Sequence, residues 1–200
     1  MRVSRVQAEK NRDTVIDVAS RLFRERGFDG IGVKDLMEEA GLTQGGFYKQ
    51  FASKEDLVAQ ASERALESVS HRWTEAAEAN PKDPLRAMVA LYLSMEHRAE
   101  MRDGCPIVSL GADAARQGSQ VKASFEAGIK AHLDILSGWI GETDDDESRD
   151  KAMVILSTMV GAMVLSRAVN DKRLSKRFLQ AGAKSVMGLS AGAAQKGQLR

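Results

Sequence analysis

The spacing of apolar residues along this chain predicts helices over most of its length. Apolar side chains recur three and four residues apart, which gives a helix one buried face. Such patterns cover about residues 8–26, 35–40, 44–51, 54–79, 85–101, 106–118, 121–140, 153–169 and 175–189. The first eight residues lack the pattern and are expected to form a mobile arm, and the end beyond 189 is expected to be frayed. The sequence therefore predicts an all-α fold.

Two short periodic segments lie next to each other between residues 35 and 51. Leu36, Met37 and Ala40 share one face of the first segment. Gly41 follows directly, and glycine readily adopts the left-handed conformation that ends a helix. We therefore expect two short helices joined by a tight turn.

The second short helix is predicted to have one apolar and one polar side. Thr43 is placed to cap its N-terminus, and Phe47 and Phe51 share one face because they are four residues apart. The residues left on the other side are Gln44, Gly45, Tyr48 and Lys49. A short helix with this polar side fits the major groove of DNA, where such side chains contact base edges and phosphates.

A third helix is predicted to begin just after Ser53, which is a favourable capping residue. Exposed helix N-termini attract phosphate, and Lys54 lies beside this one. Arg5 and Arg12 nearer the start of the chain are further candidates for phosphate or minor-groove contacts. If that arm is disordered, these two arginines make no fixed contact.

Residues from Asn11 to about Leu57 resemble the DNA-binding domain of the tetracycline-repressor (TetR) family of bacterial regulators. The matching residues are Ala19, Leu22, Phe23, Gly27, Val33, Leu36, Ala40, Gly41, Phe47, Tyr48, Phe51, Ser53, Lys54, Glu55 and Leu57. The run Ala-Gly-Leu-Thr, followed in register by Phe-Tyr and Phe-x-Ser-Lys-Glu-x-Leu, makes the match specific. The family usually carries Ser or Thr at position 32, where this chain has Gly32. Any phosphate contact there must therefore come from the backbone.

This resemblance implies a helix-turn-helix DNA-binding domain at residues 1–58 and a helical ligand-binding and dimerisation domain at 59–200. It implies a homodimer that binds a near-palindromic operator in double-stranded DNA and is released by a small apolar effector. Helices near residues 151–169 and 175–189 would form the dimer interface as a four-helix bundle. The implied DNA-contacting residues are Thr43, Gln44, Gly45, Tyr48, Lys49 and Lys54.

The amino-acid composition is compatible with a DNA-binding regulator but does not by itself indicate one. The 200 residues are 43% hydrophobic and 28% charged, with a net charge of +1. Such a balance is typical of a soluble protein and gives no general attraction to nucleic acid. No apolar run reaches the roughly 18 residues of a membrane span, and the N-terminus has no apolar signal segment. We therefore expect a cytoplasmic protein without a membrane partner.

Candidate pocket residues are the aromatic, histidine and methionine side chains of the C-terminal part. They are Met101, Cys105, Phe125, His132, Trp139, Met159 and Met163. Methionine-rich and aromatic cavities suit varied apolar ligands. The same residues also have helical spacing, which favours core packing as the role of any one of them.

Cys105 is the single cysteine, which excludes an internal disulfide and a cysteine-based zinc site. It directly precedes Pro106 at an expected helix N-terminus, where the helix dipole favours a thiolate. One interpretation is a repressor that senses oxidants or electrophiles through Cys105. The other is an ordinary apolar residue of the core or pocket.

No arrangement of residues indicates an enzyme, a cofactor or a metal site. Gly188–Gly192 matches the pattern Gly-x-Ser-x-Gly, but neither a His nor an acidic residue follows Ser190. A hydrolase elbow also needs a preceding strand, and none is predicted. A helical enzyme or an interaction scaffold remain the alternatives from other functional classes.

Overall fold

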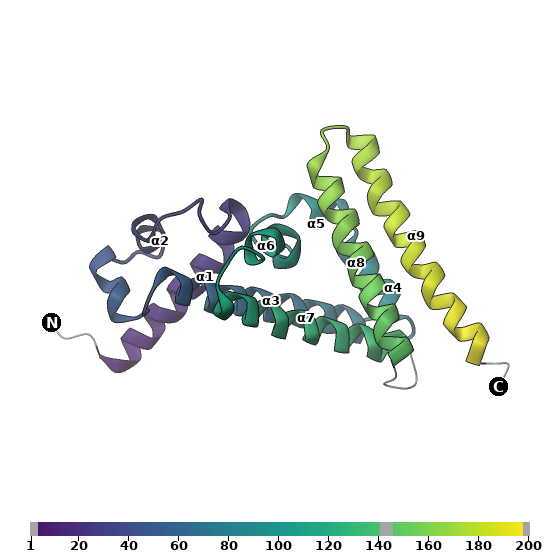
Figure 1. The fold of residues 1–200 in the computed structure, drawn as a ribbon, viewed down its shortest axis with the longest axis horizontal. Helices are drawn as coiled ribbons and strands as arrows, with labels where there is room; N and C mark the ends of the chain where they lie inside the picture. Colours follow the sequence, from purple (N-terminus) through teal and green to yellow (C-terminus); the bar gives the residue numbers. More distant parts are fainter. Residues whose placement is uncertain (1–3, 141–145, 198–200) are drawn as a thin grey trace. The chain divides into compact units, whose positions relative to one another are not determined.

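The fold was analysed in a computed structural model that describes residues 4–140 and 146–197, with side chains described up to residue 189. Every element in these ranges is helical, so the predicted all-α fold is confirmed (Figure 1). The elements are α1 (Arg5–Arg26), α2 (Val33–Glu39), the 3₁₀ helix η1 (Gln44–Lys49), α3 (Lys54–Glu78), α4 (Pro84–Tyr92), α5 (Met95–Ala99), α6 (Pro106–Ala114), α7 (Ser119–Ile140), α8 (Asp146–Ala168) and α9 (Lys172–Gly197).

The chain packs as two compact units. The first unit contains the residues up to Ser68 together with Met101–Gly128, and the second contains Val69–Glu100 together with the residues from Ile129 onward. The division at residues 58 and 59 that the resemblance implies is a functional one, and it stays a prediction.

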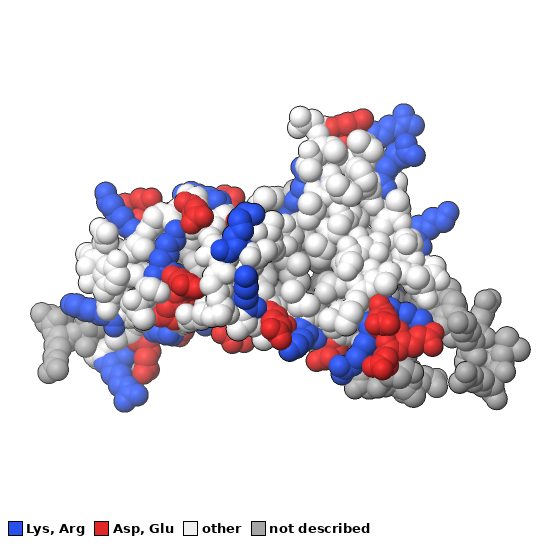
Figure 2. Space-filling model, viewed as in Figure 1, with Lys and Arg blue, Asp and Glu red and all other residues white. Residues whose placement is uncertain are grey.

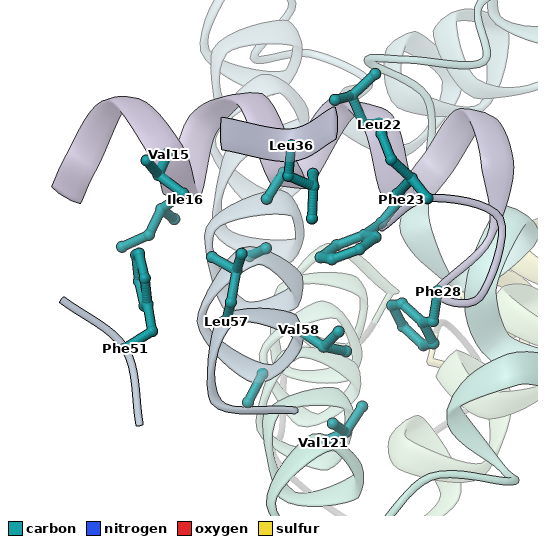
Figure 3. Packing of buried hydrophobic residues seen from close by; sticks show 14 of the residues in the cluster. Val15, Ile16, Leu22, Phe23, Phe28, Leu36, Phe51, Leu57, Val58 and Val121 are labelled. Atoms are coloured by element: carbon teal, nitrogen blue, oxygen red, sulfur yellow. The ribbon is translucent and has the colours of Figure 1, made fainter. Parts of the chain in front are cut away.

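The first unit is built around one apolar core to which α1, α2, η1, α3, α6 and α7 all contribute (Figure 3). Phe23, Phe28 and Phe125 stack edge to face through it, with ring centroids 5.6 and 6.5 Å apart. Near its other end, α7 approaches α3 so closely that a Cβ on Gly128 would lie 2.6 Å from Leu66 Cδ1. This core fixes the positions of α2 and η1 on α1 and α3.

In the second unit, α8 and α9 pack against each other as an antiparallel pair (Figure 1). Gly182 allows the close approach, because a Cβ there would lie 2.8 Å from the Ala162 side chain. By length and composition α8 is long and apolar enough to cross a membrane, although the sequence was expected to contain no such run. Ala152, Ile155 and Met159 of this helix are buried within the unit, and one such helix is by itself weak evidence of a membrane span.

The sequence predicted a mobile arm before residue 8. This prediction is wrong for the described residues from 4 onward, because α1 already begins at Arg5. Ser4 caps it by accepting a hydrogen bond from the backbone N–H of Gln7 at 3.2 Å. The arm's first three residues lie outside the described range.

The single helix expected over residues 85–101 is also wrong. Leu93 leaves the helical conformation, and the Ser94 side chain then accepts from the His97 N–H at 3.0 Å, which starts α5 as a separate helix. Helix α8 begins at Asp146 rather than 153, and α9 continues to Gly197 rather than fraying after 189. Residues 141–145 of the expected acidic loop lie outside the described range.

Candidate nucleic-acid interface

The turn between α2 and η1 forms as the sequence predicts. Gly41 adopts a φ of 69°, in the left-handed region. Its N–H donates to the Glu38 carbonyl at 2.9 Å, and the N–H of Leu42 donates to the Met37 carbonyl at 2.8 Å. These bonds satisfy the last carbonyls of α2 and fix the direction in which the chain leaves it.

The second short helix is a 3₁₀ helix. The Gly46 N–H donates to the Thr43 carbonyl and the Gln50 N–H to the Phe47 carbonyl, both at 2.9 Å, which are the i to i+3 bonds of that helix type. Gly45 and Gly46 lower α-helix propensity by roughly 1 kcal/mol each relative to Ala, so this segment is a weak α-helix former. Thr43 occupies the capping position, but its side chain accepts no capping hydrogen bond.

The apolar side of η1 is held by the core of the first unit. Phe47 is completely buried and packs with Phe51 at a ring centroid distance of 5.3 Å. Phe51 lies beneath the N-terminal half of α1, beside Val15 and Ile16 (Figure 3). A helix this short is not stable through its backbone hydrogen bonds alone. Burial of the two aromatic rings supplies the missing stabilisation.

The opposite side of η1 is exposed. The exposed residues there are Thr43, Gln44, Gly45, Tyr48 and Lys49. Tyr48 leaves 73% of its surface exposed while its ring edge packs on Phe47, with the centroids 5.1 Å apart. The structure therefore leaves five of the predicted DNA-contacting residues exposed at η1 and its N-cap.

Three further predicted contacts are placed differently. The Lys54 ammonium donates to the Phe28 carbonyl at 2.6 Å, next to the α3 N-terminus that Ser53 caps through the Asp56 N–H at 3.1 Å. Arg5 is 93% exposed and pairs with Glu9 at 3.2 Å on α1. The Arg12 guanidinium is turned inward and contacts Gln50 and Gln60.

Basic and acidic side chains are interspersed on the visible face of the molecule (Figure 2). Several of the ion pairs of α1 lie within the first unit, as between Arg64 of α3 and both Asp13 and Asp17. Over the part of the chain that is described, recognition of a polyanion would therefore rest on a few placed cations rather than on a general positive field.

The second unit contains a small pocket of about 90 Å³ between α3, α4 and α5. Its lining residues are Val69, Arg72, Trp73, Leu91, Tyr92, Ser94, Glu96, His97 and Glu100. Trp73 and Tyr92 stack edge to face with centroids 5.7 Å apart, and Tyr92 and His97 do the same at 4.7 Å. The pocket therefore has an aromatic wall and a charged rim.

None of the predicted pocket residues lines this cavity. Met101, Cys105 and Phe125 belong to the first unit, where Met101 is 40% exposed and the other two are buried. The remaining four belong to the second unit: His132, Trp139, Met159 and Met163. Of these, His132 contacts the wall of the pocket, because its ring packs edge to face on the pocket residue Trp73, with the ring centroids 4.5 Å apart.

Sequence reasoning missed the lining because its residues are spread over three helices. Trp73 was the detectable signal, since a Trp in the middle of a charged helix needs a partner for its large apolar surface. Tyr92 and His97 gain their place only through the break between α4 and α5, which the periodicity did not predict.

His97 is uncharged at neutral pH. Burial lowers the pKa of its imidazole from 6.5 to about 4, and the nearby Arg167 and Arg72 act in the same direction. Its Nδ1 lies 2.6 Å from the Tyr92 carbonyl, which favours the protonated ring but is outweighed. The inner wall of the pocket therefore presents a neutral imidazole.

Cys105 occupies the capping position of α6 and is only 1% exposed. The predicted helix N-terminus is confirmed, but burial denies oxidants direct access to the sulfur. Elsewhere, no group of three His, Cys, Asp or Glu side chains within residues 4–140 and 146–189 is arranged to hold a metal ion.

Comparisons with known proteins agree with this geometry. Residues 15–61 match the family model described as bacterial regulatory proteins, tetR family. The chain is 24% identical over 157 residues to the HTH-type transcriptional regulator LmrA of Bacillus subtilis, which covers 77% of this chain and 82% of LmrA. It is 26% identical over 129 residues to the HTH-type transcriptional repressor NemR of Escherichia coli, which covers 63% of this chain and 65% of NemR.

Solved structures share the fold. The reduced form of Escherichia coli NemR superposes with a TM-score of 0.74 at 21% identity, covering 88% of this chain and 95% of that one. A TetR-family regulator from Cytophaga hutchinsonii gives a TM-score of 0.78 at 20% identity, covering 96% and 98%. The likeness extends over both compact units.

Proposed function

This chain belongs to the TetR family of bacterial regulatory proteins, and from that premise we propose that it represses transcription by binding operator DNA as a cytoplasmic homodimer. The observation that carries the proposal is the exposed polar surface of η1 above a fully buried Phe47. A rigid short helix with that surface can enter a major groove, and a two-fold dimer presents two of them to a near-palindromic site.

Each exposed residue of η1 has a contact that suits its chemistry. The Gln44 amide can bond an adenine edge, Lys49 a guanine or a phosphate, and the Tyr48 hydroxyl a phosphate. Lys54 has three ammonium protons, so it can bond a phosphate while it keeps the Phe28 carbonyl. Arg5 is exposed enough to add a backbone contact.

The partner for dimerisation is a second copy of the chain, bound through α8 and α9. These helices expose large apolar side chains, namely Met153, Val154, Val164, Leu165, Leu174 and Leu189. Met153 and Val164, like Val154 and Leu165, are 11 residues apart and so share one face after about three turns. Such an apolar surface is typical of a protein interface.

The effector is a small, largely apolar and aromatic molecule that binds the pocket lined by Trp73, Tyr92 and His97. The stacked rings of the wall favour a flat ligand, and the neutral His97 adds no charge to it. A ligand that binds one dimer geometry better than another shifts the population away from the form that fits both grooves.

The first test is selection of genomic DNA fragments by the purified protein at about 0.15 M salt. Recovery of a near-palindrome supports the repressor, and Tyr48→Ala should then weaken binding to selected and unrelated duplexes alike, since a phosphate contact carries no sequence information. Recovery of unrelated fragments only, even after refolding to strip any bound ligand, would contradict the proposal.

The effector site is tested with phenol as the probe, because a single aromatic ring suits a pocket of about 90 Å³. We expect it to release the labelled fragment from the wild-type protein, and Leu91→Trp should raise the concentration needed at least tenfold because it fills the pocket mouth. Met95→Trp is the matched control, since Met95 is exposed but does not line the pocket. Equal effects of the two variants would rule out this pocket.

A thiol-responsive repressor is the second candidate. The position of Cys105 at the N-terminus of α6 favours it, and its burial opposes it. Cys105→Ser separates the two, since a thiol switch requires that this variant stay bound to DNA in the presence of an electrophile.

A further inference from the structure

The Arg12 guanidinium is engaged in contacts inside the first unit. Its Nη2 donates to the Gln60 side-chain oxygen at 2.5 Å, and its Nε lies 3.4 Å from the Gln50 carbonyl. The guanidinium carbon lies 5.3 Å from the centroid of the Phe51 ring, within the range of a cation–π interaction. The Arg12 side chain thus connects α1 to the Gln50 carbonyl and the Phe51 ring, which follow η1, and to Gln60 of α3.

The same segment is held from its other side by Asp56. One carboxylate oxygen of Asp56 accepts from the Ala52 N–H at 3.0 Å, and the other accepts from the Gln60 amide at 2.7 Å. Gln60 therefore joins the two anchors, because its oxygen accepts from Arg12 while its amide donates to Asp56. Residues 50–52, through which the chain leaves η1, are fixed at three consecutive positions.

Asp56 is suited to this as an ionised group. Burial acts to raise the pKa of its carboxyl, but the hydrogen bonds from Ala52, Gln60 and Gln120 and the charge of Arg12 outweigh burial and hold the pKa below its ordinary value of 3.8. The Gln120 contact, at 3.4 Å, comes from the first turn of α7. The anchor is therefore charged on both sides at neutral pH.

We propose that Arg12 is a positioning residue that sets the orientation of η1 through Gln60 and residues 50–52, and that it does not contact DNA. The inference rests on the proposed DNA-binding function. The position of Arg12 near the N-terminus predicts a phosphate or minor-groove contact. The contacts of its guanidinium assign it a structural role instead. The core holds the apolar side of η1. Because η1 makes only short-range backbone bonds, its angle to α1 also depends on side-chain anchors of the segment that follows it.

The chemistry requires arginine rather than any cation. The contacts use two different nitrogens of a planar group and its flat face, which lysine cannot reproduce. A phosphate contact, in contrast, needs mainly a positive charge, and lysine supplies that well. The substitution Arg12→Lys therefore distinguishes the two roles.

The test compares Arg12→Lys, Arg12→Gln and Gln60→Ala with the wild type. Binding is measured against the fragment that the wild-type protein selects and against a duplex of the same length with shuffled sequence, at several salt concentrations. Gln7→Ala is the matched control, because Gln7 is exposed on α1 and its side chain bonds Asn11 rather than η1.

We expect Arg12→Lys and Gln60→Ala each to weaken binding to the selected fragment by roughly tenfold, as for loss of a charge-assisted hydrogen bond. Binding to the shuffled duplex and the salt dependence should stay as in the wild type. If instead Arg12→Lys binds like the wild type and Arg12→Gln reduces the salt slope by about 0.9, Arg12 contacts a phosphate and the inference is wrong.

Hydrogen exchange gives a measurement that needs no DNA. The Phe51 N–H bonds the Phe47 carbonyl at 3.0 Å and the Ala52 N–H bonds Asp56, so both report on the anchored segment. Both amides should exchange at least several-fold faster in Arg12→Lys and Gln60→Ala, while the amides in the middle of α1 keep their protection. Unchanged exchange would overturn the inference, whereas failure of the wild type to select any fragment would overturn the proposed function without changing this result.

Discussion

The two compact units are both helical, but they expose opposite kinds of surface. Around η1 the first unit presents Gln44, Tyr48 and Lys49, whereas α8 and α9 of the second unit present aliphatic side chains such as Val164 and Leu165. A polar surface on a buried aromatic base suits a charged, hydrated ligand, and an apolar surface suits another apolar surface. Under the proposed function, the difference divides recognition of DNA and recognition of a second copy between the two units.

The interiors differ as well. The first unit is filled by apolar side chains, and its buried Arg24 bonds the carbonyls of Ser20 and Gly104, both at 2.9 Å. The second unit buries the rings of Trp73, Tyr92, His97 and His132 beside a cavity. Burying polar rings beside a cavity costs free energy of folding compared with a filled apolar core. We therefore expect a small molecule to bind in this interior.

The largest expected effect comes from removing the base of η1. Phe47→Ala deletes a fully buried ring and should lower the free energy of unfolding of the first unit by about 3–5 kcal/mol. Urea denaturation followed by circular dichroism measures it, and operator binding should be lost with it. A loss under about 1 kcal/mol would mean that η1 does not depend on this core.

The next effect concerns the apolar surface of the second unit. Val164→Glu places a charge where the dimer would bury it, and the dimer dissociation constant should rise at least 100-fold, or about 2.7 kcal/mol. Sedimentation equilibrium measures the constant, with Ala123→Glu on the exposed side of α7 as the control. A dimer that tolerates Val164→Glu would move the interface away from α8.

The interior of the second unit should make stability depend on pH. The folded state keeps His97 neutral down to about pH 4, while the unfolded state binds a proton near pH 6.5, so stability falls as the pH drops through that window. Between pH 7 and 5 the loss should be about 2 kcal/mol.

Chemical denaturation at both pH values measures this loss, and His97→Gln should flatten the dependence, since its amide can still donate to the Tyr92 carbonyl. The lowered carboxyl pKa values of Glu25, Asp56 and Asp83 act only at lower pH, where their protonation removes further stability. An equally steep dependence in the variant would place the titrating group elsewhere.

The smallest effect is expected at Cys105. Cys105→Ser replaces a buried thiol by a hydroxyl of similar size at a helix cap, so operator affinity should change by less than about twofold. Fluorescence anisotropy with labelled operator, with and without an electrophile, measures it. Release of the wild type alone by the electrophile would favour the thiol switch over the small apolar effector.

Much of the first unit was predictable because its determinants are local. Gly41 follows an apolar face and favours the end of a helix, and Ser53 favours the start of the next one. Phe47 and Phe51 are large apolar residues in a short polar stretch, so both were expected to be buried. The 3₁₀ geometry of η1 was not predictable, since it depends on how the paired glycines and the core balance two similar backbone forms.

The sequence by itself determined the all-α fold, the order of the helices and the outward residues of η1. These follow from spacings of three or four residues, within which a side chain's neighbours are known once the helix is assumed. Tertiary structure alone decided that Lys54 bonds Phe28, that Arg12 meets Gln60 across 48 positions, and that Trp73, Tyr92 and His97 enclose a pocket. Contacts between distant segments depend on how helices cross and where they break, and no local pattern encodes that geometry.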